Sequence, residues 1–188
     1  MKKMVNEIDT FRSKNYDLRK ISSINPQIDT IVFHYTGMKS SNDALERLCD
    51  PESKVSSHFL IDEDGDIYRL VEDKYRAWHA GRSFWRGEED INSYSLGIEL
   101  VNPGHEFVYK EFSNRQINSL IQLCIQLIDK YNISEKNIVG HSDIAPGRKK
   151  DPGELFPWRK LASHGIGIWP DKDILPCFNN TFWKNISL

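Results

Sequence analysis

Two histidines stand at the ends of short apolar runs, where a strand presents its last side chains to its neighbours. His34 lies in IVFHY, and His141 follows NIVG. Side chains at such strand ends are held rigidly, as metal ligands and catalytic groups must be. A single histidine there could merely hydrogen-bond a backbone carbonyl, but two of them, with an acidic loop after the second, favour a metal site.

The loop after His141 offers two carboxylates as a third ligand, Asp143 and Asp151. Zinc in catalytic sites typically has three protein ligands and keeps one position for water, and two histidines with one carboxylate fit that count. The spacing does not choose between the two aspartates. Asp143 could instead cap the turn that follows His141.

Two further residues have chemistry that suits a metal site. Lys149 stands two residues before Asp151, so in an extended segment both side chains leave the same face. Its charge could stabilise an oxyanion, although a Lys-Lys-Asp run is also typical of a solvated turn. Glu99 lies within SLGIELV with no obvious counterion. Burial would raise its pKa, as a general base needs, whereas on an edge strand it would simply face solvent.

The segment AWHAGRSFWRGEED places aromatic side chains among glycines. Trp78, His79, Phe84 and Trp85 could line a groove for a sugar or a peptide, or they could pack over the core. The pattern favours neither interpretation.

Apolar, β-rich stretches predict the strands that position these residues. They cover residues 29–35, the two arms of a hairpin around Gly65, 95–101 and 137–140. Helices are predicted at 41–49, capped by Ser41 or Asn42, and at 113–131, where Ser113 and Gln116 match a capping box. Strands separated by helices predict a single α/β domain with a mixed central β-sheet flanked by helices.

The remaining segments show no sustained period. We expect residues 1–28 to form an N-terminal arm, 29–170 the domain itself, with a loop after His141, and 171–188 a C-terminal tail. Cys49, Cys124 and Cys177 form no Cys-x-x-Cys pair, which argues against a disulfide scaffold and a cysteine zinc site. Cys124 is expected to be a small buried hydrophobe.

The composition excludes several classes of function. The 188 residues carry 25 Lys and Arg against 27 Asp and Glu, so a net charge of −2 supplies no attraction for nucleic acid or an anionic membrane. No apolar run approaches the ~20 residues of a membrane span, and the basic start lacks the apolar stretch of a secretory signal. As written, the chain is expected in the cytoplasm; a trimmed signal would instead place it in the periplasm or outside the cell.

Taken in order, these segments resemble the bacterial zinc-dependent N-acetylmuramoyl-L-alanine amidases of the amidase-2 class, relatives of peptidoglycan recognition proteins and phage lysozyme-type amidases. The resemblance covers about residues 29–170 and is carried by IVFHYTG, VSSHFLIDEDGDIYRLV, AWHAG, NSYSLGIELVN, SEKNIVGHSDIAPGRKKDPG, LFPW and GIGIWPD. AWHAG and GIGIWPD look closest to the AmiD branch, with AmpD nearby. Phage and recognition-protein relatives carry a catalytic tyrosine where this chain has Ser57; the AmiD and AmpD branch uses the glutamate instead.

The resemblance implies a metal site with defined ligands. The zinc ligands of the family fall on His34, His141 and Asp151. It therefore implies one zinc ion per chain and no organic cofactor.

The resemblance also implies a reaction. The catalytic glutamate falls on Glu99 and the lysine on Lys149, while His79, with its neighbour Trp78, matches positions that line the substrate cleft. The reaction is hydrolysis of the amide between N-acetylmuramic acid and L-alanine, in peptidoglycan or muropeptides, by a chain expected to be a monomer. The alternative is a non-catalytic peptidoglycan-binding module of the same fold, which would be expected to lack a zinc ligand.

Overall fold

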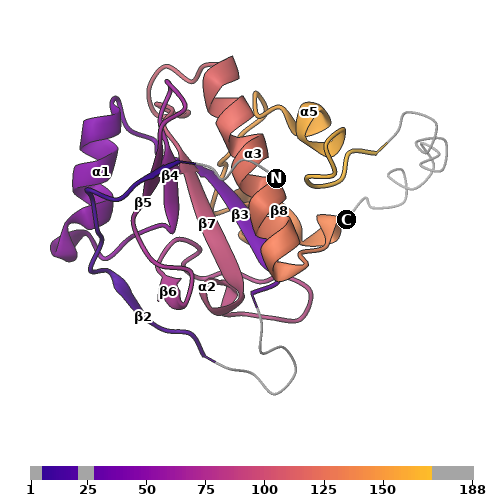
Figure 1. Ribbon diagram of the computed structural model, residues 1–188, viewed down its shortest axis with the longest axis horizontal. Helices are drawn as coiled ribbons and strands as arrows, with labels where there is room; N and C mark the ends of the chain where they lie inside the picture. The colour runs from indigo at the N-terminus through magenta and orange to yellow at the C-terminus, as the bar shows by residue number, and fades with distance from the viewer. Residues whose placement is uncertain (1–5, 21–27, 171–188) are drawn as a thin grey trace, which may run out of the picture.

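The structure is a computed structural model that describes residues 6–20 and 28–170 (Figure 1). Its strands are β1 (Glu7–Ile8), β2 (Tyr16–Leu18), β3 (Thr30–Tyr35), β4 (Phe59–Ile61), β5 (Ile67–Arg69), β6 (Tyr75–Ala77), β7 (Ser95–Leu100) and β8 (Ile138–Gly140). Its helices are α1 (Ser41–Cys49), α2 (Ile91–Tyr94), α3 (Asn114–Tyr131), α4 (His141–Ile144) and α5 (Trp158–Ala162), with 3-10 turns at Pro51–Ser53 and Glu135–Asn137. Within these residues no helix has the length and apolar character needed to cross a membrane.

A six-stranded sheet in the order β1-β5-β4-β7-β3-β8 forms the centre of the molecule. Strands β4, β7, β3 and β8 run parallel, while β5 is antiparallel to β4, with Gly65 at positive φ in the hairpin, as predicted. Parallel strands need cover on both faces, and helices supply it here. The predicted fold, a single α/β domain with a mixed central sheet flanked by helices, is confirmed.

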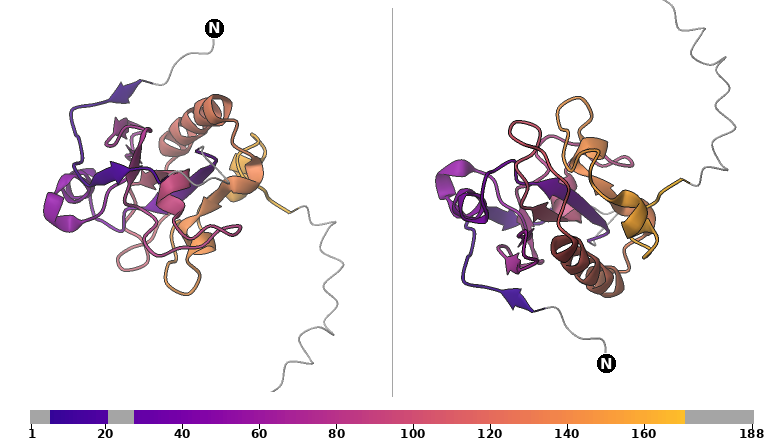
Figure 2. Two further views of the ribbon diagram at one scale, coloured as in Figure 1. Left: turned by 90° about the horizontal axis from the view of Figure 1, so that it is seen from below. Right: turned by 90° about the horizontal axis from the view of Figure 1, so that it is seen from above.

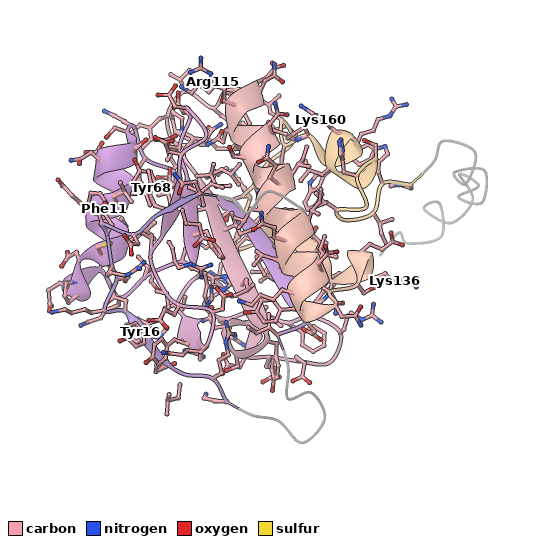
Figure 3. All side chains as sticks on the ribbon, in the orientation of Figure 1. Phe11, Tyr16, Tyr68, Arg115, Lys136 and Lys160 are labelled. Carbon is pink, nitrogen blue, oxygen red and sulfur yellow. The ribbon has the colours of Figure 1, made fainter. Side chains whose placement is uncertain are left out.

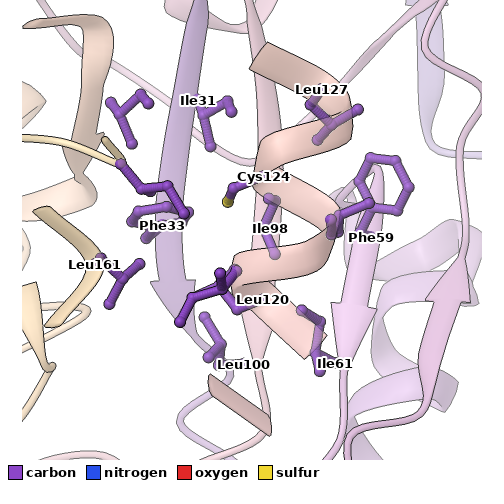
Figure 4. Close-up of a cluster of buried hydrophobic side chains, with 14 of the residues drawn as sticks. Ile31, Phe33, Phe59, Ile61, Ile98, Leu100, Leu120, Cys124, Leu127 and Leu161 are labelled. Atoms are coloured by element: carbon purple, nitrogen blue, oxygen red, sulfur yellow. The ribbon is translucent and has the colours of Figure 1, made fainter. Parts of the chain in front are cut away.

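The long helix α3 covers one face of the sheet (Figure 4). Beneath it lie Ile31 and Phe33 of β3 and Ile98 of β7. They form one hydrophobic cluster with Leu120 and Cys124 of the helix. All five side chains have no exposed surface. Cys124 is thus a small buried hydrophobe, as predicted.

The opposite face of the sheet carries the polar side chains. Seen edge-on, α3 lies on one side of the sheet and the segment 141–155 on the other (Figure 2). Successive strand residues point to opposite faces, so the register that buries Phe33 and Ile98 under α3 turns His34 and Glu99 away from it. Towards the β1 edge the same opposite face is apolar, because Leu60 of β4 contacts α1 there.

Helix α1 begins one residue from the predicted cap. Ser40, not Ser41 or Asn42, is the N-cap: its backbone is extended and its side chain accepts a hydrogen bond from the N–H of Asp43. The helix ends at Cys49, just before Pro51, as predicted.

Helix α3 is held to the sheet by a residue that was predicted to cap it. Ser113 is the N-cap and accepts from the N–H of Gln116. The Gln116 side chain does not complete the predicted capping box; it is fully buried and donates to the carbonyls of Ile61 (3.0 Å) and Val101 (3.1 Å). This side chain therefore ties α3 to the ends of β4 and β7.

The part of the arm that the structure describes, residues 6–20, is built into the fold. Strand β1 pairs with β5 at the edge of the sheet, and β2 pairs antiparallel with β6. Ser13 and Asn15 are buried and hydrogen-bond to carbonyls at the end of α1, while Phe11 lies edge-on to Tyr68 (Figure 3). Two strands of two and three residues show no periodicity, so the sequence did not predict them.

Short elements account for the other differences. Strand β6 and helix α2 were not predicted, and the expected loop after His141 begins with one helical turn, α4, and runs into α5. Each of these has three to five residues, too few to show a period. The predicted tail 171–188 lies outside the described residues.

Candidate active site

The ends of three parallel strands assemble the candidate site. His34 of β3 pairs in register with Glu99 of β7. On the other side of β3, strand β8 ends at Gly140 and His141 follows it directly. The two histidines at strand ends therefore lie side by side, as the strand-end argument predicted.

His34, His141 and Asp151 form a compact buried cluster. The Nδ1 atoms of the two histidines lie 2.9 Å apart. Oδ2 of Asp151 is 3.0 Å from Nδ1 of His34 and 2.9 Å from Nδ1 of His141. The three residues are 1%, 3% and 7% exposed. Two imidazole nitrogens and one carboxylate oxygen that converge on one point suit a divalent metal ion such as zinc. The donor set therefore fits a metal centre.

The structure brings Asp151, not Asp143, to the histidines. The backbone carbonyl of Asp151 accepts a hydrogen bond from the N–H of Ser142 at 2.9 Å. This bond holds the loop that carries Asp151 against α4. Asp143 is exposed, and its Oδ2 accepts from the N–H of Gly140 at 2.7 Å. It caps the turn, which was the other possibility for this residue.

Burial sets the protonation of the cluster. Desolvation, reinforced by neighbouring His141, lowers the pKa of His34 to about 4, so its imidazole is neutral near pH 7. Burial opposes the ionisation of Asp151, but hydrogen bonds with His141 and His34 hold its pKa well below the ordinary value. Neutral imidazole and ionised carboxylate are the forms that bind a metal.

Glu99 lies on a central strand. The alternative prediction, that it faces solvent from an edge strand, is therefore wrong. Strand β7 has β4 on one side and β3 on the other. The side chain is half-buried, and its Oε2 is buried without a hydrogen-bond partner in the described part of the chain. Burial, reinforced by Asp151 and opposed by Lys149, raises the pKa of Glu99 to about 8. The carboxylate thus stands next to the cluster with a free oxygen.

A pocket of roughly 1220 Å³ opens onto this face of the sheet. The three cluster residues, Glu99 and Lys149 line it together with Trp78. Lys149 is exposed, as the solvated-turn interpretation expects, and yet borders the pocket. The pocket is large enough for a drug-sized ligand.

The aromatic segment serves both of the uses that its pattern left open. Trp78 is half-buried at the pocket and donates its indole N–H to Oδ2 of Asp17 at 3.3 Å. Trp85 packs on a small cluster around Val32, whereas Phe84 is 57% exposed. His79 is buried, with its Nδ1 at 3.1 Å from Nε2 of His34.

Sequence reasoning missed the residues that hold this segment in place. The side-chain oxygen of Asn92 accepts from the N–H groups of His79 and Ala80. The carbonyl of Ala80 accepts from Nε2 of His141 at 3.0 Å. Asn92 sits in NSYSLGIELVN beside the strand of Glu99, and only its burial in the folded chain, at 4% exposed, distinguishes it from a surface amide.

Ser57, the residue that departs from the tyrosine of phage relatives, has a structural contact. Its hydroxyl donates to the carbonyl of Gly97 at 2.7 Å, and the side chain is fully buried. It is not among the residues that line the pocket.

Comparison with known proteins adds to this geometry. A family model described as N-acetylmuramoyl-L-alanine amidase matches residues 24–154. The chain is 41% identical over 165 residues to N-acetylmuramoyl-L-alanine amidase AmiD of Escherichia coli, covering 81% of this chain and 59% of that relative. It is 32% identical over 181 residues to 1,6-anhydro-N-acetylmuramyl-L-alanine amidase AmpD of Haemophilus influenzae, covering 86% of this chain and 94% of that relative.

A solved structure agrees with these matches. The complex of E. coli AmiD with anhydro-N-acetylmuramic acid-L-Ala-D-gamma-Glu-L-Lys has a TM-score of 0.72 and 41% identity to this chain, over 82% of this chain and 64% of that one. The match therefore spans little more than half of the E. coli AmiD sequence but almost all of the H. influenzae AmpD sequence.

Proposed function

Because the chain belongs to the N-acetylmuramoyl-L-alanine amidase family of the amidase-2 class, we propose that it hydrolyses the amide between N-acetylmuramic acid and L-alanine. The observation that carries this proposal is the buried cluster of His34, His141 and Asp151 beside the free oxygen of Glu99, at the base of one pocket. A substrate of this kind, anhydro-N-acetylmuramic acid joined to a stem peptide, is bound in the AmiD complex. Peptidoglycan and the muropeptides released from it are the proposed substrates.

The metal is proposed to be zinc, one ion per chain, held by His34, His141 and Asp151. Two histidines and one carboxylate are a known ligand set of catalytic zinc. An ion held there would supply positive charge that acidifies a water molecule and polarises a carbonyl oxygen. The burial of these three residues would strengthen such electrostatic effects.

Glu99 is proposed as the proton carrier. Its free Oε2 accepts the proton of the attacking water and then delivers that proton to the amine of L-alanine as the amide bond breaks. A carboxyl whose pKa burial shifts toward neutrality can both take and release a proton near pH 7. The nearby positive charge of a metal would keep it ionised before attack.

Lys149 and Trp78 are proposed to act on the substrate. The ammonium of Lys149 stands at the pocket, where it stabilises negative charge on the oxygen of the scissile carbonyl. Trp78 offers an apolar ring surface to the sugar or the first residues of the peptide. His79 also borders the pocket, and it contacts His34.

The proposed catalytic domain is residues 29–170, with 1–28 as an arm that joins the sheet through β1 and 171–188 as a tail. All proposed ligands, Glu99 and the pocket come from one chain. We therefore propose that the protein works as a monomer.

The proposal is tested by adding the purified protein to anhydro-muropeptides and, in parallel, to purified sacculi, with zinc supplied or chelated. Mass spectrometry should detect free L-Ala-terminated stem peptides and the corresponding peptide-free sugars, and only with zinc. A protein that carries stoichiometric zinc, binds these substrates and leaves both intact would be a binding module, and the proposal would be wrong. The relative yield from the two substrates shows which of them the enzyme uses.

A further inference from the structure

His79 is wedged between a proposed metal ligand and the start of strand β7. Its Nδ1 lies 3.1 Å from Nε2 of His34, and its Nε2 lies 3.2 Å from Oγ of Ser95. The ring also rests on Gly97, where an added Cβ would approach its Cγ to 2.4 Å. A residue at position 97 without a side chain is therefore required for this placement of His79.

The hydrogen bonds around His79 can be assigned from one fixed acceptor. The hydroxyl of Ser95 donates to the carbonyl of Ile91 at 2.6 Å, and a carbonyl can only accept. With its proton used there, the Ser95 oxygen must accept from Nε2–H of His79. A neutral imidazole has one N–H, so Nδ1 of His79 carries a lone pair and accepts from Nε2–H of His34.

This assignment determines which nitrogen of His34 is free. With Nε2 protonated, Nδ1 of neutral His34 carries the lone pair, and Nδ1 is the atom that faces His141 and Asp151. The second histidine is arranged alike, because Nε2 of His141 lies 3.0 Å from the carbonyl of Ala80, next in the chain to His79. Two consecutive residues, His79 and Ala80, therefore accept hydrogen bonds from the Nε2 atoms of the two histidines.

We propose that His79 is a positioning residue of the metal centre: through the chain Ile91, Ser95 and His79 it fixes the tautomer and the ring orientation of His34. The proposal rests on the proposed function, in that it takes His34 to be a zinc ligand. It adds to the sequence-based expectation for His79, a place in the lining of the substrate cleft, since His79 also borders the pocket.

The segment that carries His79 is itself rigidly held. The side-chain oxygen of Asn92 accepts from the N–H of His79 at 3.1 Å and from that of Ala80 at 2.8 Å. Both Asn92 and Ser95 are buried, at 4% and 0% exposed. Partners that orient a metal-binding histidine in this way are typically worth 10–100-fold in metal affinity.

The test is the zinc affinity of the full chain, measured by competition with a chromophoric chelator. His79→Leu fills the space but accepts no hydrogen bond, and we expect its zinc Kd to rise about 10–100-fold. His79→Asn places an amide oxygen near the position of Nδ1, and its Kd should return to within a few-fold of wild type. His164→Leu is the matched control, because His164 is exposed and should leave the Kd unchanged.

A fourth variant, at position 95, guards against a folding defect at position 79. Ser95→Ala removes the acceptor for Nε2–H of His79 and leaves the ring in place, so we expect a smaller loss of zinc affinity in a protein whose circular dichroism spectrum stays native. Nitrogen-15 spectra of the metal-free protein report the tautomer directly, and His79 should show its proton on Nε2.

Each outcome decides a separate point. If His79→Leu folds and binds zinc as tightly as wild type, or if His79 carries its proton on Nδ1, the inference is wrong. An equal loss in His79→Leu and His79→Asn at equal stability would also contradict it, since the accepted hydrogen bond would then be irrelevant. A wild-type protein that binds no zinc would instead overturn the proposed function.

Discussion

His34 and Glu99 are direct register partners on neighbouring parallel strands, on the face of the sheet that α3 does not cover. The ring of His34 has a contact for each nitrogen, whereas Oε2 of Glu99 is buried and has none within the described residues. One residue of the pair is thus fixed by its neighbours, and the other keeps a free oxygen. This contrast is what a metal ligand beside a general base requires.

Glu99→Gln should separate proton transfer from folding. Glutamine keeps the volume and an oxygen but cannot take up the proton, so we expect kcat to fall about 10²–10⁴-fold with zinc content unchanged. The thermal midpoint should stay the same or rise, because a carboxylate oxygen that is buried without a partner disfavours the folded state. Glu111→Gln, an exposed control outside the pocket, should retain full turnover. Wild-type turnover in the Glu99 variant would exclude the proposed role.

Asp151→Asn and Asp143→Asn are a matched pair for the metal. Both remove one carboxylate charge from the segment after β8, but only Asp151 lies in the cluster. We expect metal analysis to show stoichiometric zinc in Asp143→Asn, whose amide oxygen can still accept from Gly140, and a sharp loss in Asp151→Asn. The reverse pattern would mean that the third ligand is misassigned.

The two aspartates also show which part of the site the sequence could not predict. The apolar, β-rich runs predict strands at 29–35 and 95–101, which carry His34 and Glu99, and the motifs predict the family, which is confirmed. The loop that carries Asp143 and Asp151 has no period. What brings Asp151 to the histidines is a backbone hydrogen bond from Ser142, together with the lack of a side chain at Gly140, where a Cβ would meet Pro152 at 2.6 Å.

His79 and Gln116 each make contacts that the sequence did not predict, for a related reason. Each belongs to a segment that the sequence identified, but its partners come from other segments: His34 for His79, and the ends of β4 and β7 for Gln116. Local spacing records which residues share one element. It does not record which side chains meet across elements, so these contacts appear only in the folded chain.

Gln116→Leu tests the tie between α3 and the sheet. The change leaves the carbonyls of Ile61 and Val101 buried without this donor, so we expect the free energy of unfolding to fall by about 2–3 kcal/mol. Gln122→Leu, on the exposed side of the same helix, should change it by less than about 0.5 kcal/mol. Urea unfolding gives both values, and similar effects for the two variants would contradict the assigned contact.

The free energy of unfolding should depend on pH through the carboxyl group of Asp73. Burial opposes its ionisation, but hydrogen bonds from Lys130 and Tyr131 and the charge of Arg69 lower its pKa from 3.8 to about 2. A carboxyl with a lower pKa in the folded state stabilises the fold above its unfolded pKa, and that stabilisation is lost as pH falls through the folded pKa.

Asp73→Asn should therefore cost about 2 kcal/mol of unfolding free energy near neutral pH. The difference between wild type and variant should shrink between about pH 4 and about pH 2, as the wild-type carboxyl takes up its proton. Urea unfolding of both proteins across this range measures it. A difference that stays constant to the lowest pH would show that the ion pairs of Asp73 do not contribute as described.

The central claim is that the chain cleaves one particular amide with water, and oxygen-18 water tests it most directly. Hydrolysis of an anhydro-muropeptide in labelled water should place one oxygen-18 in the new lactyl carboxylate of the anhydro-N-acetylmuramic acid. The released peptide should begin with L-alanine and carry no label, and metal-free protein should leave the substrate intact. Label in a peptide carboxylate, or cleavage anywhere other than the sugar–alanine amide, would contradict the claim.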